Sequence, residues 1–161
     1  MPAGSQQLAI QARPPDVVVS LPGEPKGKGR PRARIATTSR GHQFVSVYTD
    51  ADTRSYEGML RFAGAQAMRG RVPLHCALKV QLTATFSIPG SWSGKKQGQA
   101  IAGLIRPTSR PDADNILKSV DALNGVVWKD DSLIVDCRIE KYYGHSPSLL
   151  IEVWQHTGLL L

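Results

Sequence analysis

Hydrophobic and polar residues alternate along several stretches of the chain with the period of a β-strand. The longest of these stretches, 75–88, predicts the central strand of a sheet. Its residues on one face would be Leu78, Val80, Leu82, Ala84 and Phe86. Shorter strands are expected at 17–21, 44–48, 133–143 and 148–155. The pattern therefore predicts a domain built around a β-sheet.

Two helices are expected between these strands. Thr49 and Asp52 have the spacing of a capping box, and the residues that follow predict a helix that runs to about Met68 and ends at Gly70. Asp114 is expected to cap a second helix, which would extend from Asn115 to about Asn124. The buried stripe of this second helix would be Ile116, Val120 and Leu123.

Length and composition place these elements in one domain. The chain has 161 residues, of which 41% are hydrophobic, enough for a single buried core. Residues 1–15 mix Gly, Ser, Gln and Pro and are expected to form a flexible tail. Residues 16–161 are expected to form a single small α/β (α+β) domain. Within it, the Gly/Ser-rich residues 89–99 predict a loop, either plainly solvated or mobile.

Charge is distributed unevenly along the chain. The net charge is +7, and residues 58–111 contain eight Lys or Arg and no Asp or Glu, whereas residues 112–152 contain eight acids and four bases. A basic surface of this kind favours nucleic acid or an anionic membrane as the partner. No long apolar run or basic amphipathic helix supports a membrane, and no signal-peptide pattern is found, so an intracellular, cytoplasmic protein is expected.

The basic residues suggest where nucleic acid would bind. Between 26 and 34 a cation stands at every second position, so an extended chain would place all of them on one face. This pattern indicates either a row of phosphate contacts or an edge strand protected by charge. The candidate DNA-binding residues are Lys26, Lys28, Arg30, Arg32, Arg34, Lys95, Lys96, Arg106 and Arg110.

Residues 110–131 concentrate five of the thirteen acidic residues in a short stretch. Asp112 and Asp114 flank one alanine, Lys118 lies one helical turn further on, and the short turn after Asn124-Gly125 would return Asp131 towards them. Convergent carboxylates are hard oxygen ligands suited to Mg²⁺ or Mn²⁺. The alternative is that these acids only cap a helix, occupy a turn and solvate a loop.

At these residues the sequence resembles the RusA family of Holliday-junction resolvases from bacteria and phages. The matching residues are Asp112-Ala113-Asp114-Asn115, Lys118, Asp121-Ala122-Leu123, Trp128 and Asp130-Asp131. A second match is GEPKGKGRPR, followed by YTDADTRSYE. Together these motifs extend the resemblance over most of the chain between 17 and 154.

The resemblance implies a mixed β-sheet with two main helices, a homodimer, a nucleoid-associated location and Mg²⁺-dependent cutting of four-way DNA junctions. It implies that Asp112, Asp114 and Asp131 are catalytic and bind the metal ion, and that Lys118 is catalytic. No small-molecule cofactor is expected. Junction specificity follows from the resemblance alone, not from composition or spacing.

Three other functions compete with junction resolution. The chain would be a non-catalytic basic DNA-binding protein if the acids only support a helix. It would be a nuclease for other branched DNA if four-way junctions are not its preferred substrate. A nucleotide- or sugar-transferring enzyme could use the Asp-x-Asp motif, but the sequence has no glycine-rich phosphate loop to support it.

Overall fold

The structure is a computed structural model that describes residues 13–156. Its strands are β1 (Val17–Pro22), β2 (Arg32–Thr37), β3 (Gln43–Tyr48), β4 (Leu78–Ser87), β5 (Ile134–Gly144) and β6 (Ser148–Gln155). Its helices are α2 (Ala51–Met68), α3 (Gly94–Ile101) and α4 (Ala113–Ser119), with the short 3-10 helices η1 (Val120–Leu123) and η2 (Asp131–Leu133). The predicted tail, 1–15, lies almost wholly outside the described residues.

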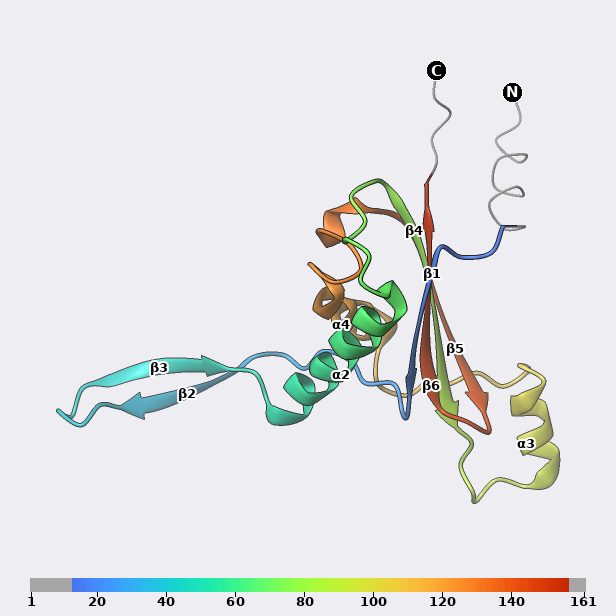
Figure 1. The fold of residues 1–161 in the computed structure, drawn as a ribbon. Coiled ribbons are helices and arrows are strands. Elements are labelled where there is room, and N and C mark those ends of the chain that lie inside the picture. The colour runs from blue at the N-terminus through green and yellow to red at the C-terminus, as the bar shows by residue number, and fades with distance from the viewer. Residues whose placement is uncertain (1–12, 157–161) are drawn as a thin grey trace, which may run out of the picture.

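Four strands form the main sheet in the order β1-β6-β4-β5 (Figure 1). β4 lies inside the sheet and pairs antiparallel with β6 and parallel with β5, so the sheet is mixed, as expected. The alternation that predicted this strand is confirmed, because Leu78, Val80, Leu82 and Ala84 are fully buried on one face. The residues between them, such as Gln81 and Thr83, face away from the core and are partly exposed.

The core lies between one face of this sheet and a layer formed by α2, α4 and η1 (Figure 1). α2 presents Tyr56, Leu60 and Met68 to the core. It packs closely on η1 at Gly64, where an added Cβ would lie 2.7 Å from a methyl group of Leu123 and would force that side chain to move. The expected small α+β domain is therefore confirmed.

Both predicted helices exist, but they begin at other residues than expected. α2 is capped by Asp50, whose carboxylate accepts a hydrogen bond from the Thr53 amide at 2.8 Å, and not by Thr49. The N-cap position of α4 is Asp112, whose carbonyl accepts a hydrogen bond from the Ile116 amide, and not Asp114. Asp114 lies in the first helical turn instead. The expected helix 115–124 is also split, since α4 passes into η1 at Val120.

The expected loop at 89–99 is partly wrong, because α3 begins at Gly94 within it and runs to Ile101. Ser93 caps this helix by accepting a hydrogen bond from the Lys96 amide. Trp92 packs edge-on against Tyr143, with ring centroids 5.1 Å apart, and the Lys96 ammonium lies over the Trp92 ring. These contacts hold this stretch against β5, although the Gly and Ser content of residues 89–99 suggested an unstructured loop.

β2 and β3 form a separate two-stranded hairpin that extends away from the main sheet (Figure 1). We refer to this hairpin, residues 32–48, as the arm. The pattern predicted a strand at 44–48, and β3 confirms it, whereas the expected extended row of cations becomes a strand only from Arg32 onwards. None of the described helices is long and apolar enough to cross a membrane.

Candidate active site

Residues 23–31, which we call the strap, join β1 to the arm and lie across the first turns of α4 and α2. The Lys28 amide donates a hydrogen bond to the Asn115 carbonyl at 2.8 Å. An added Cβ at Gly27 would lie 2.8 Å from the Asn115 Cβ, and one at Gly29 would lie 2.8 Å from an Asp50 carboxylate oxygen. The two glycines therefore allow the strap to pack directly on both helices.

The strap brings the Lys28 side chain between two acids that are distant in sequence. Its Nζ lies 3.3 Å from a carboxylate oxygen of Asp121 and 3.3 Å from one of Glu57. Partial burial acts to lower the pKa of Lys28, but the hydrogen bonds and charges of Asp121 and Glu57 outweigh it and raise this pKa. Lys28 is therefore engaged with two acids, although it still lines the same pocket as Lys26 and Arg30.

Asp114 and Lys118 form an ion pair across one turn of α4. The Lys118 Nζ lies 3.0 Å from the Asp114 carboxylate, and both side chains are more than half exposed. The hydrogen bond from Lys118 lowers the pKa of Asp114, so this carboxylate stays ionised at lower pH than usual. This spacing, i to i+4, was readable from the sequence, and the structure joins the pair as expected.

Beside this ion pair, Lys118, Asp121 and Asp131 line a pocket of about 320 Å³. Desolvation raises the pKa of Asp131, and the negative charges of Asp121 and Asp130 raise it further. Asp130 itself caps η2 by accepting a hydrogen bond from the Ser132 amide at 2.9 Å, and its hydrogen bonds with Ser132 lower its pKa. The two neighbouring acids, Asp130 and Asp131, thus have different surroundings.

A buried tryptophan fixes the turn that carries these acids. Trp128 is fully buried, and its Nε1 donates a hydrogen bond to the Asn124 side chain at 2.7 Å. The backbone on either side of Trp128 is bonded to Leu74. Gly125 adopts a φ of +74°, which confirms the left-handed turn expected at Asn124-Gly125. Asp131 therefore returns to α4 because this turn is anchored in the core.

The structure separates the three metal ligands expected from the sequence. Asp131 shares its pocket with Asp121, Asp114 is paired with Lys118, and Asp112 lines a neighbouring pocket of about 740 Å³ together with strap residues. Within residues 13–156, no three His, Cys, Asp or Glu side chains are grouped closely enough to hold one metal ion. The expected convergence of Asp112, Asp114 and Asp131 on one ion is therefore not found.

The donor set nevertheless fits a hard divalent cation. Mg²⁺ is commonly held by one or two carboxylates, while waters and substrate phosphates complete its shell. Asp121 and Asp131 are two such carboxylates in one pocket, and their mutual repulsion is the kind that a bound cation relieves. Asp121 was not among the expected ligands, although it lies seven residues after Asp114. No pattern in the sequence indicated the contact of Glu57 with Lys28.

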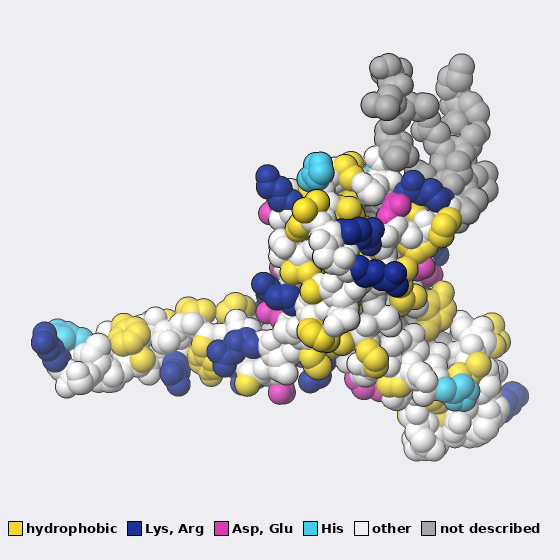
Figure 2. All heavy atoms as spheres, in the orientation of Figure 1, with side chains coloured by type: hydrophobic (Ala, Val, Ile, Leu, Met, Phe, Trp, Pro, Cys, Tyr) yellow, Lys and Arg dark blue, Asp and Glu magenta, His cyan; other side chains and the backbone are white. Residues whose placement is uncertain are grey.

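The basic side chains fall into separate groups. Lys26, Arg30 and Arg110 line the larger pocket beside Asp112. Arg32 and Arg34 lie on the arm, which carries several basic side chains along its length (Figure 2). Lys95 and Lys96 belong to α3, which packs against β5. Arg106 is engaged within the fold, since its guanidinium stacks 3.5 Å from the Tyr142 ring centroid and donates to the Lys141 carbonyl.

The site combines acids and a lysine on and beside α4 with a neighbouring pocket lined by basic residues. These are the components of a phosphodiester-cutting site on a nucleic-acid-binding domain. The sequence model of the family described as "Endodeoxyribonuclease RusA" matches residues 22–154. The chain therefore belongs to the RusA endodeoxyribonuclease family, whose members are endonucleases that resolve Holliday junctions. This membership confirms the resemblance seen in the sequence.

A relative was also found among curated proteins. The chain is 33% identical over 135 residues to "Uncharacterized protein YqaN" of Bacillus subtilis (strain 168). The alignment covers 81% of this chain and 90% of that protein. The similarity therefore extends over almost the entire relative.

Proposed function

We propose that this protein is a Mg²⁺-dependent, structure-specific endodeoxyribonuclease that resolves four-way DNA junctions during recombination and repair. The observation that carries the proposal is the family match, which spans every acid discussed above together with Lys118. The grouping of Asp114, Lys118, Asp121 and Asp131 around α4 supports it. The protein would act as a homodimer, so that two sites cut two symmetry-related strands.

Each side chain has a distinct part in the proposed reaction. Asp131 would hold the divalent ion together with Asp121, while Asp112 and Asp114 would complete the acidic site once a DNA phosphate enters it. Mn²⁺ would serve as a substitute ion. The bound ion would supply Lewis-acid stabilisation of charge on the phosphodiester. Lys118 would orient the Asp114 carboxylate through their 3.0 Å contact and stabilise negative charge on the scissile phosphate.

The basic residues would hold the phosphate backbone of the junction. Lys26, Arg30 and Arg110 line the pocket beside Asp112, so they would contact phosphates next to the proposed cutting site. Arg32 and Arg34 on the arm, and Lys95 and Lys96 on α3, would extend the contact along the arms of the junction. Because these contacts release counterions, binding would weaken steeply as salt increases.

The decisive experiment compares cleavage of a synthetic four-way junction, a fork and a linear duplex of related sequence, in Mg²⁺ and in EDTA. We expect the wild-type protein to cut the junction at paired positions in Mg²⁺ only. Asp114→Asn is expected to keep junction binding and to lose cutting by at least about a hundredfold. Glu152→Gln is the matched control, because Glu152 lies on the open face of β6, away from α4.

The outcomes separate the competing functions. Equal cutting of linear duplex would refute junction specificity but retain a nuclease, and preference for the fork would identify another branched substrate. If neither Mg²⁺ nor Mn²⁺ supports cutting while junction binding persists in wild type and Asp114→Asn alike, the protein is a DNA-binding protein without catalysis. Sedimentation equilibrium on the same preparations tests the homodimer.

A further inference from the structure

The two faces of the arm differ in character. The pairing of β2 with β3 places Ala33 opposite Val47 and Ile35 opposite Val45 on one face, which we call the apolar face of the arm. The other face carries Arg32 and Arg34 together with the aromatic side chains of Phe44 and Tyr48, and the Arg34 guanidinium lies over the Tyr48 ring at 5.4 Å. On the apolar face, Ile35, Val45 and Val47 are 71%, 67% and 66% exposed. Three adjacent β-branched side chains thus face solvent together.

An arm of this kind needs a partner surface. A two-stranded hairpin is marginally stable in water by itself, and an exposed row of β-branched residues promotes association. Within residues 13–156, β2 and β3 pair only with each other, and neither makes more than marginal contact with another element. The apolar face is therefore uncovered in a single chain.

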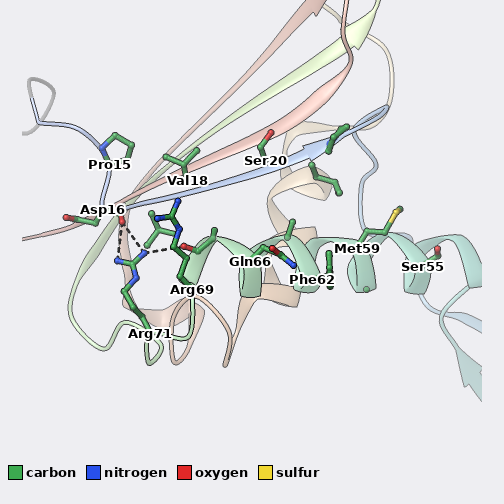
Figure 3. A pocket seen from close by; sticks show the side chains of 16 residues that line it. Pro15, Asp16, Val18, Ser20, Ser55, Met59, Phe62, Gln66, Arg69 and Arg71 are labelled. Carbon is green, nitrogen blue, oxygen red and sulfur yellow. Dashed lines mark hydrogen bonds between the residues drawn. The ribbon is translucent and has the colours of Figure 1, made fainter.

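The body of the same chain has an uncovered apolar groove. It lies between β1, the edge strand of the sheet, and the exposed side of α2, and its volume is about 1310 Å³ (Figure 3). Met59 and Phe62 of α2 line it and are 46% and 67% exposed. The charged residues on its border, Asp16, Arg69 and Arg71, lie together at one end (Figure 3).

The arm and the groove match in length and in charge. Each strand of the arm has six residues and spans about 20 Å. The part of α2 that lines the groove, from Ser55 to Ala67, spans about 18 Å. The apolar face of the arm carries no charge, and the arginines of the arm point away from it, so they would not meet Arg69 and Arg71 in the groove.

The arm cannot fill the groove of its own chain. Only residues 49–50 separate β3 from α2, and the arm continues outward from the start of α2, away from the sheet (Figure 1). The strap holds the other end of the hairpin against Asn115 and Asp50. Turning the arm back over α2 would break these contacts, so the groove is available to the arm of another chain.

We infer that the arm of one chain docks by its apolar face into the groove of a second copy, and that the second arm docks reciprocally around a two-fold axis. This inference rests on the homodimer of the proposed function and specifies its contact surface. In such a dimer Arg32 and Arg34 stay on the outer face of each docked arm, where they remain available to DNA.

Disulfide trapping tests the contact directly in the full-length chain. In a background of Cys76→Ala and Cys137→Ser, one tagged copy carries Val45→Cys on the arm and a differently tagged copy carries Met59→Cys in the groove. We expect the mixture to form a disulfide-linked pair of the two copies on oxidation. The matched control pairs Val45→Cys with Val135→Cys, which lies exposed on β5 at the opposite edge of the sheet.

Two results would overturn the inference. If two Val45→Cys copies link to each other, the arms pair with each other. If the protein is a dimer but no disulfide forms, the interface lies elsewhere. A monomeric wild-type protein also overturns it. These readouts do not depend on cutting. Cleavage without the predicted linkage therefore refutes the docking and spares the nuclease, and linkage without cleavage does the reverse.

A second set of variants addresses the energetics by sedimentation equilibrium. Ile35→Glu on the arm and Phe62→Glu in the groove are each expected to weaken the dimer about tenfold or more, because each buries a charge in an apolar contact. Leu104→Glu is the control, since Leu104 is exposed outside both surfaces. If Ile35→Glu lowers junction affinity and leaves the dimer unchanged, the apolar face binds DNA and the inference fails.

Discussion

Replacing Gly27 with alanine tests whether the strap positions the acidic site. The added Cβ would lie 2.8 Å from the Asn115 Cβ, 3.0 Å from the Pro111 Cβ and 3.3 Å from the Asn115 carbonyl carbon. Ordinary van der Waals contact begins at 3.4 Å, so the strap or α4 must move by about 0.6 Å. Overpacking of this size costs about 1–3 kcal/mol.

The displacement acts on the residue next to Asp114. Because small errors in the position of reacting groups reduce catalysis strongly, we expect Gly27→Ala to slow junction cutting by about tenfold or more. The loss of stability should lower Tm by roughly 3–10 °C for a domain of this size. Differential scanning calorimetry and single-turnover cleavage of the four-way junction measure the two effects.

Gly98→Ala in α3 is the matched control for this substitution. An added Cβ at Gly98 meets no atom within 4 Å, and alanine is the better helix former, so stability should be unchanged or slightly increased. Cutting should also be unchanged. If Gly27→Ala behaves like Gly98→Ala in both assays, the close packing of the strap on α4 is refuted, together with its role in positioning the acids.

Three further predictions concern the core, the acids and the DNA contact. Trp128→Phe removes the hydrogen bond to Asn124 and should cost about 1–2 kcal/mol in chemical denaturation, with slower cutting because the turn before Asp131 loosens. Asp121→Asn removes a negative charge beside Asp131 and should lower its pKa in an NMR titration; an unchanged pKa would contradict their proximity. Because the pKa of Asp131 is raised, the native state binds this proton more tightly than the unfolded chain does. The stability that protonated Asp131 contributes is therefore present at low pH and is lost as pH rises through the raised pKa. Arg110→Ala should weaken junction binding and reduce the slope of log affinity against log salt by about one, and an unchanged slope would exclude a phosphate contact.

The sheet could be predicted from the sequence because strand patterns are local. In β4 every second residue is apolar over most of its length, and the buried set matches the expected set up to Ala84, beyond which Phe86 is only partly buried. The pairing order β1-β6-β4-β5 was not predictable in this way. It depends on which edges meet in space, and no residue pattern within a single strand records that.

In the candidate site, too, local contacts could be predicted from the sequence and contacts between distant segments could not. The spacing of Asp114 and Lys118 is a property of one helical turn, and the structure joins them as expected. The contact of Lys28 with Asp121 joins residues 93 positions apart and was not foreseeable from either segment. A row of alternate cations suggested a strand with all charges on one face. The strap instead packs on Asn115 outside any strand, and Lys28 contacts Asp121 and Glu57.

The strap connects the two surfaces on which the proposals depend. Its middle is fixed to α4 at Asn115 and to α2 near Asp50, and Lys28 links α2 to η1 through Glu57 and Asp121. The arm begins directly after these contacts, and two residues beyond the arm α2 begins. Both ends of the hairpin are therefore attached to the helices that carry the acids. The hairpin cannot reorient without displacing α4 or α2 of its own chain. An arm held in the groove of a second copy would therefore fix the orientation of the two acidic sites relative to each other, as well as forming the dimer contact.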